Sequence, residues 1–292
     1  MNLALLQFKH FWIDILGLWW PGEKTIRPQS HWTIRFQFTR RVLFDFQRLC
    51  AEYQTEYRNK DGKATAVVID VDAAKELCAH YRASKEGRTE YSYLVYPPAK
   101  LFSRRLFELA IGSRNVKGVI FLAGGTASGK SSVVASYKHQ DRSLVIMDGT
   151  LSDYAIAHQQ IWRCIAAGKF ALVVYVYTPI DVAMTRALDR AINRGRVLSL
   201  EVFSATHFES QKTIQRLQKC HNYEINFAIR AFNGLNGDAL EFETIPIYKS
   251  LHDVQSRAND CFERELLDRS SQGKPIPGRI IEKFRQSGRR VG

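Results

Sequence analysis

The stretch "FLAGGTASGKSSVV", residues 121–134, decides the fold. The pattern Gly-x-x-x-x-Gly-Lys-Ser/Thr is matched by Gly124, Gly129, Lys130 and Ser131. An apolar run precedes the stretch and predicts a strand, and a helix is expected from about Lys130. A glycine-rich turn between a strand and a helix offers phosphate groups its backbone N–H groups and the positive end of the helix. The stretch therefore predicts a binding site for a nucleoside triphosphate.

The whole loop is expected to bind the nucleotide, through Gly124, Gly125, Thr126, Ala127, Ser128, Gly129, Lys130, Ser131 and Ser132. We expect Lys130 to reach the β- and γ-phosphates of ATP and the Ser131 hydroxyl to ligate Mg²⁺. The motif does not specify the reaction, because P-loop proteins include kinases, GTPases and motor ATPases.

Apolar runs at 64–70, 143–150 and 170–179 alternate with helical patterns. Such alternation favours parallel strands joined by crossover helices. Further strand candidates are 226–234 and 239–248. The predicted fold is therefore α/β, with a doubly wound, mostly parallel sheet of the P-loop kinase type and an N-terminal helical extension. The expected division is a helical extension over 1–62, a kinase core over 63–250, and a helical and basic C-terminal tail over 251–292.

Two helix boundaries are expected outside the core motifs. Ser30 is a candidate N-cap of a long helix that runs to about Tyr57. Downstream, "YPPAKLFSRRLFELAIG" predicts a helix that is opened by Pro97 and Pro98 and ends near Gly112.

Composition limits the location and the partners of the chain. The first 22 residues are apolar, but Lys9, His10 and Asp14 interrupt them before a membrane span is complete. A helix that docks on the core and a helix that lies on a membrane surface both fit this segment. The five cysteines are scattered singly, which favours a reducing, cytoplasmic location. The net charge of +13 favours polyanionic ligands such as nucleotides, nucleic acid or acidic lipid.

Arginines recur after the run at 170–179. Arg186, Arg190 and Arg194 are spaced four residues apart, and Arg196 follows Gly195. A kinase needs cations that close over the transferred phosphoryl group, because negative charge spreads over its oxygens. The alternative interpretation of each arginine is a solvated basic helix face.

These pieces together resemble the zeta toxin family of P-loop kinases. "VIFLAGGTASGKSS" is similar to the family's strand and phosphate loop, and "LVIMDGT" to its substrate-binding element, here Asp148, Gly149 and Thr150. The resemblance places Arg190 and Arg196 at the two catalytic arginine positions. It extends over about residues 64–250 and implies an ATP-dependent kinase with an antitoxin partner.

In the family, a strand ending in Asp-x-Asp follows the phosphate-loop helix and carries the catalytic base. In this chain the sequence "ATAVVIDVDAAKEL" supplies Asp70 and Asp72 before the loop, so we predict a rearranged chain order. Acids just past a strand end lie at the ligand crevice of such a sheet. We expect Asp72 to be the base, with Asp70 supporting it or touching substrate or Mg²⁺. The alternative is that both acids cap a helix. Asp148 fits a substrate ligand, an acid that holds Mg²⁺ through water, or the start of a turn.

The family phosphorylates UDP-N-acetylglucosamine on a sugar hydroxyl, and an acid on an intervening helix helps to bind that substrate. Here Arg104 and Arg105 lie where that acid is expected, which favours a more anionic acceptor such as NAD. The predicted function is transfer of the ATP γ-phosphoryl group to a hydroxyl of a nucleotide-type metabolite. The alternatives are a nucleic-acid end kinase, suggested by the basic tail, and a non-kinase NTPase that acts through protein interaction.

Overall fold

The computed structural model describes residues 29–61, 67–135, 143–220 and 226–286. Its strands are β1 (Val67–Asp70), β2 (Gly118–Ala123), β3 (Leu144–Asp148), β4 (Phe170–Tyr177), β5 (Phe227–Asn233) and β6 (Ala239–Leu240). Its helices are α2 (Gln29–Phe44), α3 (Phe46–Asp61), α4 (Val71–Lys75), α5 (Ala79–Arg82), α6 (Lys85–Gly112), α7 (Lys130–Ala135), α8 (Tyr154–Ala166), α9 (Ile180–Arg194), α10 (Leu200–Gln218), α11 (Leu251–Ser271) and α12 (Gly278–Arg285), with a 3₁₀ turn η2 (Phe242–Thr244).

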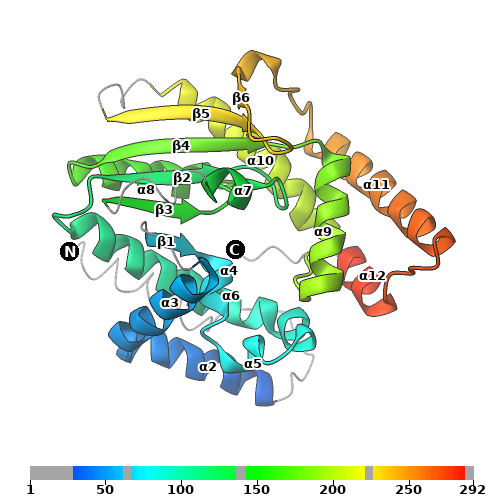
Figure 1. Cartoon of the computed structure of the whole chain (residues 1–292), viewed down its shortest axis with the longest axis horizontal. Coiled ribbons are helices and arrows are strands. Elements are labelled where there is room, and N and C mark those ends of the chain that lie inside the picture. The colour runs from blue at the N-terminus through cyan, green and yellow to red at the C-terminus, as the bar shows by residue number, and fades with distance from the viewer. Residues whose placement is uncertain (1–28, 62–66, 136–142, 221–225, 287–292) are drawn as a thin grey trace, which may run out of the picture.

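The strands form one sheet in the order β1-β3-β2-β4-β5-β6, and Figure 1 shows these strands side by side. The first five strands are parallel, and β6 pairs antiparallel with β5. This sheet, with helices on both sides, confirms the predicted fold class. β1 precedes the phosphate loop in the chain but lies beside β3, where Asp70 is in register with Asp148. The carboxyl ends of parallel strands meet at one edge of a sheet, so this pairing brings the two acids together.

The two faces of the sheet bury different cores. One face packs Ile69, Phe121 and Val173 against the apolar sides of α2, α3, α6, α8 and α10. On the opposite face Ile120 and Val174 contact Val133 of α7. Nearly every side chain of β2 is buried, which explains its unbroken apolar sequence.

The N-terminal helices differ from the prediction. The expected single helix is two, α2 and α3, which are separated by a bend at Asp45. Ser30 lies inside the first turn of α2, so the prediction that it is the N-cap is wrong. The apolar segment at residues 1–22, for which two interpretations stood open, lies outside the described residues.

The proline-containing helix also begins earlier than predicted. α6 starts at Lys85, where the Ser84 side chain accepts a hydrogen bond from the Gly87 N–H, and Pro97 and Pro98 lie in its interior. Proline removes one backbone donor and usually ends or kinks a helix. Here burial outweighs that cost, because the following side chains Ala99 and Phe102 are fully buried in the main core.

The C-terminal region packs on the core instead of forming a loose tail. α9, α11 and α12 lie together beyond one end of the strands in Figure 1 and share a second apolar core. Phe284 of α12 is fully buried and stacks on Phe262 of α11 with ring centroids 5.3 Å apart. Residues 278–285, part of the predicted helical and basic C-terminal tail, are therefore helical and packed on the protein. No described helix has the length and apolar character that crossing a bilayer demands.

Candidate active site

The phosphate loop follows β2 and is held by its own backbone. Gly124 has a φ of 131°, and a Cβ there would lie 2.4 Å from the Val176 carbonyl oxygen, so the position requires glycine. Ala127 also has a positive φ, of 62°, which is costly for a residue with a side chain. Such strained backbone is typical of functional loops. The Thr178 hydroxyl donates to the Ser128 carbonyl at 2.7 Å and ties the loop to the end of β4.

Lys130 lies at the start of α7 and folds back over the loop. Its Nζ donates to the carbonyl oxygens of Gly124 at 2.9 Å and Gly125 at 2.7 Å. Burial lowers the pKa of Lys130 to about 8, and the charge of Asp148 opposes this shift. The ammonium group is thus held in the nucleotide-binding motif, close to the acid at the end of β3.

The middle of α10 packs on the phosphate loop. The buried ring of His207 lies so close to Gly125 that a Cβ there would be 2.2 Å from it. His207 Nε2 is 3.0 Å from the Thr126 carbonyl oxygen, and the Thr126 N–H donates to the Thr206 hydroxyl at 3.2 Å. Burial lowers the pKa of His207 to about 4, so the ring is neutral near pH 7. A neutral imidazole that donates to a carbonyl fits this geometry.

The Asp-Gly-Thr segment after β3 joins the same assembly. The Thr150 carbonyl accepts hydrogen bonds from the Gly124 N–H at 3.2 Å and from the Ser210 hydroxyl at 2.5 Å. Its own hydroxyl lies 2.9 Å from that of Ser152. The predicted substrate-binding element is therefore directly attached to the phosphate loop and to α10.

Asp70 ends β1 and caps the helix that follows. Its Oδ1 accepts a hydrogen bond from the Asp72 N–H at 2.8 Å, so the capping interpretation holds for Asp70. Burial, followed by the charges of Asp148 and Asp72, raises the pKa of Asp70 to about 7. A carboxyl group with such a pKa changes its charge in the physiological range.

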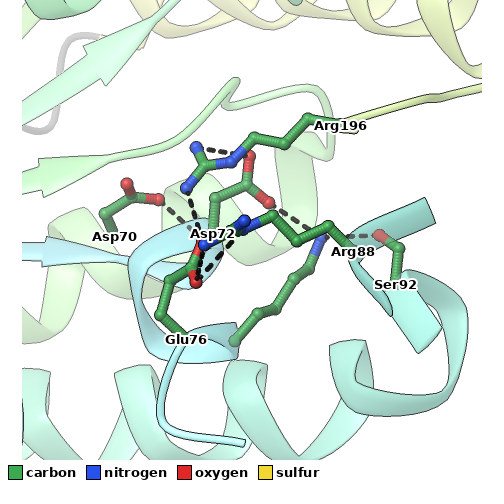
Figure 2. A network of polar contacts seen from close by, with 7 residues as sticks. Asp70, Asp72, Glu76, Arg88, Ser92 and Arg196 are labelled. Atoms are coloured by element: carbon green, nitrogen blue, oxygen red, sulfur yellow. Dashed lines mark hydrogen bonds and ion pairs between the residues drawn. The ribbon is translucent and has the colours of Figure 1, made fainter. Parts of the chain in front are cut away.

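Asp72 belongs to a network that we call the acid–arginine cluster: Asp70, Asp72, Glu76, Arg88 and Arg196, which Figure 2 shows together. Lys75 Nζ lies 2.8 Å from Asp72 Oδ1, and Arg196 Nη1 lies 4.0 Å from Asp72 Oδ2. Lys75, with a smaller contribution from Arg196, lowers the pKa of Asp72 to about 2. In this arrangement Asp72 is firmly ionised and a weak proton acceptor.

The three arginines spaced along α9, which ends before Arg196, have different surroundings. Arg186 Nη1 donates to the Gly234 carbonyl at 3.0 Å and lies beside Gly129 of the phosphate loop. Burial lowers the pKa of Arg190, and the nearby charges of Asp72 and Asp148 oppose this shift. Arg194 is exposed at the end of the helix. The predicted pair Arg190 and Arg196 therefore lies near the carboxylates, whereas Arg194 is the solvated arginine.

The oxygen donors near the loop fit Mg²⁺. Ser131 is exposed at the start of α7, and the register of β1 and β3 sets Asp70 beside Asp148. Mg²⁺ prefers one or two carboxylates together with phosphate oxygens and water to a cage made only of protein ligands. Among the described residues no group of three His, Cys, Asp or Glu side chains forms such a cage. A cation beside Asp70 and Asp148 would also offset the repulsion between them.

Of the two arginines found where the family's helix acid is expected, Arg105 has a structural role. Arg105 Nη1 donates to the carbonyl oxygens of Val42 at 2.6 Å and Leu43 at 3.1 Å, and its guanidinium lies 4.2 Å from the Phe46 ring centroid. It thus fastens the carboxyl end of α2 instead of facing a substrate. The expectation that Arg105 favours an anionic acceptor is therefore wrong.

Sequence reasoning missed four residues of the site: Lys75, Glu76, Arg88 and His207. Glu76 and Arg88 have no motif around them, and His207 is remote in sequence from the loop it contacts. One signal was present in the short helix after β1, where Asp72, Lys75 and Glu76 share one face at spacings of three and four residues. A buried helix that opens with charged residues on one face indicates a polar site.

Comparison with known proteins points to a family of kinases. The model of the zeta toxin family matches residues 134–231, which extend from α7 through β3, α8, β4, α9 and α10 into β5. The matched region begins just after the phosphate-loop motif and contains Asp148, Thr150, Arg190 and Arg196. No curated protein matches the chain. The match confirms the resemblance to the zeta toxin family of P-loop kinases, and it implies a kinase-like, ATP-dependent activity.

Proposed function

We propose that the protein transfers the γ-phosphoryl group of ATP to a hydroxyl group of a nucleotide-type metabolite. The observation that carries this proposal is the convergence of Lys130, the carboxylates at the ends of β1 and β3, and Arg196. Their charges act on one another, since the pKa values of Lys130 and Asp70 both respond to Asp148. Phosphoryl transfer consists largely of positioning and charge stabilisation, which such a set of groups supplies.

On the donor side, Lys130 and the backbone N–H groups of the loop hold the phosphates. Ser131, with Asp148 nearby, would hold Mg²⁺, which when bound neutralises charge on the β- and γ-phosphates. Lys130 must leave the Gly124 and Gly125 carbonyls to reach the nucleotide. Arg190 and Arg196 would neutralise the charge that develops on the transferred group.

On the acceptor side, the pKa values favour Asp70 as the base, whereas the sequence had led us to expect Asp72. A general base works best when its pKa lies near the operating pH. Asp70 has a pKa of about 7, whereas Asp72 has a pKa of about 2 because Lys75 and Arg196 stabilise its charge. We therefore propose Asp70 as the group that accepts the hydroxyl proton, with Asp72 orienting the acceptor or Arg196. The location of β1 before the loop supports the predicted rearrangement of the base-bearing strand.

The acceptor candidates are UDP-N-acetylglucosamine and NAD, and an antitoxin partner follows from the same resemblance. A nucleic-acid end kinase is less favoured, because tail arginines are engaged within the protein. Arg269 pairs with Asp189 at 2.8 Å, Arg279 with Glu86 at 2.7 Å, and Arg285 with Glu263 at 2.9 Å. A non-kinase NTPase leaves the acids at the end of β1 without a role.

An acceptor panel tests the proposal. Consumption of ATP is measured alone and with UDP-N-acetylglucosamine, NAD or an oligonucleotide with a 5′ hydroxyl, and products are identified by mass spectrometry. We expect a nucleotide-type acceptor to gain one phosphoryl group. ATP hydrolysis that no acceptor stimulates would favour the NTPase, and a labelled oligonucleotide would favour the end kinase.

A further inference from the structure

Glu76 is a buried carboxylate shared by two arginines. Its side chain is 6% exposed. Arg88 reaches both of its oxygens, with Nε 3.0 Å from Oε1 and Nη2 3.0 Å from Oε2. Arg196 Nη2 donates to the same Oε1 at 3.2 Å, from a segment 120 residues further along the chain. Figure 2 shows Arg88 and Arg196 converging on this one carboxylate.

Arg88 already bonds both oxygens of Glu76, so the contact with Arg196 is additional to a complete ion pair. A buried ion pair needs good geometry to offset the cost of desolvation, and the two-oxygen contact with Arg88 provides it. The Arg196 side chain is 26% exposed, and its guanidinium extends past Glu76 toward Asp72. The carboxylate therefore holds one amino group of Arg196 while the other faces Asp72 in α4.

The backbone beside Arg196 is fixed to the same region. Gly195 ends α9 in the left-handed conformation, with a φ of 69°, and its carbonyl accepts a hydrogen bond from the Thr89 hydroxyl at 2.9 Å. A Cβ at Gly195 would lie 2.2 Å from the Lys85 carbonyl oxygen. The start of α6 thus holds the main chain of the arginine segment, and Glu76, at the end of α4, holds the Arg196 side chain.

We propose that Glu76 is a positioning residue, which, braced by Arg88, holds the Arg196 guanidinium beside Asp72, where the transferred phosphoryl group needs a cation. This inference rests on the proposed phosphoryl transfer. Glu76 acts only through Arg196 and touches neither nucleotide nor acceptor. Without its charge, Arg196 keeps its chain anchor at Gly195 but loses the orientation of its guanidinium.

The kinetic test is a double-mutant cycle. Misplacement of a catalytic group by about 1 Å costs on the order of 100-fold in rate. We expect Glu76→Gln to lower kcat about 10- to 100-fold, with the KM for ATP changed less than about twofold. In an Arg196→Ala background the same substitution should change kcat less than about twofold, because residues that act through one another are not additive. Equal losses in both backgrounds would overturn the proposal.

The control is Glu52→Gln. Both carboxylate oxygens of Glu52 also accept hydrogen bonds from one arginine, Arg41, at 3.2 and 2.9 Å. Glu52 lies on α3, away from the loop. Its substitution should leave kcat unchanged. Because Glu76→Gln leaves Arg88 without its partner, the double variant Glu76→Gln with Arg88→Gln replaces the charge pair by two amides. We expect the same loss of kcat from it, with folding checked by circular dichroism.

A second readout does not depend on turnover. Guanidinium signals of Arg196, assigned in ¹⁵N-labelled protein by their loss in Arg196→Lys, should show restricted rotation in the wild-type protein and free rotation in Glu76→Gln. Unchanged signals would overturn the proposal even if activity fell. If the wild-type protein transfers no phosphoryl group, the proposed function fails, and the spectra still decide whether Glu76 holds Arg196.

Discussion

The phosphate loop and the acid–arginine cluster are built in different ways by the same chain. The loop is one run of residues, 124–132, in which Lys130 contacts carbonyls only five and six residues earlier. The cluster draws its charges from the end of β1, from α4, from α6 and from the segment after α9. The proposed donor side of the site is thus encoded locally, and the proposed acceptor side is assembled by the fold.

This difference has an energetic consequence. Loop geometry depends mainly on glycines and on main-chain hydrogen bonds, so a side-chain change there removes function with little effect on folding. In the cluster Asp72, Glu76, Arg88 and Arg196 are ion-paired, so removing one of them leaves a partly buried charge without its partner. We therefore expect variants of the loop to separate activity from stability and variants of these four residues to couple them, whereas Asp70 is repelled by the acids beside it.

A large effect is expected from Lys130→Ala. The ammonium group is the loop's only side-chain cation, and loss of such a preorganised donor costs about 100- to 1000-fold in kcat. Phosphoryl transfer and ATP affinity would be measured, with thermal unfolding as the check on folding. Lys100→Ala, at an exposed position of α6, is the control. Transfer by the Lys130 variant within about tenfold of the wild type would contradict the assigned role.

Asp70→Asn should lower the activity but raise the stability of the folded protein. General-base loss costs about 100- to 10,000-fold in rate. The pKa of Asp70 is about 7 when folded and near its ordinary value, about 4, when unfolded, so the folded protein binds more protons between these pH values. Stability contributed by this group is therefore lost as pH rises through 7. Asparagine caps a helix as well as aspartate, so the variant should unfold at a higher temperature at pH 8.

The same pKa predicts a pH profile. The wild-type kcat/KM for ATP should fall below about pH 7, approaching tenfold per unit, because only ionised Asp70 accepts a proton. The Asp70 variant should lack this acidic limb. A wild-type profile that is flat from pH 5 to 8 would instead indicate Asp72, whose pKa is about 2, as the base.

The arginine helix offers an internal comparison. Arg190→Ala should lower kcat about 100-fold, since its partly buried cation lies near the acids of the site. Arg194→Ala, one turn further along at an exposed position, should leave kcat within about twofold. Steady-state kinetics of both variants would test this contrast. Equal losses would mean that the helix acts only through its overall charge.

The smallest effect is expected from His207→Gln. Loss of one buried hydrogen bond costs about 1 kcal/mol, which corresponds to about fivefold weaker ATP binding by calorimetry. The pKa of His207 is about 4 when folded and about 6.5 when unfolded, so the unfolded chain binds more protons between these pH values. Wild-type stability should therefore fall as pH drops from about 6.5 to 4, and the variant should lack this component. An identical pH dependence in both proteins would contradict the buried, neutral histidine.

The sequence predicted the sheet and the phosphate loop because both depend on local signals. Unbroken apolar strands, glycines and the lysine of the motif each act within a few residues. It also singled out Asp70, Asp72 and Arg196, which the structure brings together, although it did not indicate which carboxylate has the higher pKa. That property depends on Lys75, Arg196 and Asp148, which reach the acids only through strand register and helix packing. Arg105 was misinterpreted for the same reason, because α2 supplies the carbonyls that it binds.

Transfer of a labelled phosphoryl group tests most directly whether the two sides form one site. The protein is incubated with ATP carrying ¹⁸O on its γ-phosphoryl group, together with UDP-N-acetylglucosamine and NAD, and the products are analysed by mass spectrometry. We expect the labelled phosphoryl group on a hydroxyl of one acceptor, in amounts that fall with either Lys130→Ala or Asp70→Asn. Label found only in inorganic phosphate would contradict the proposed kinase.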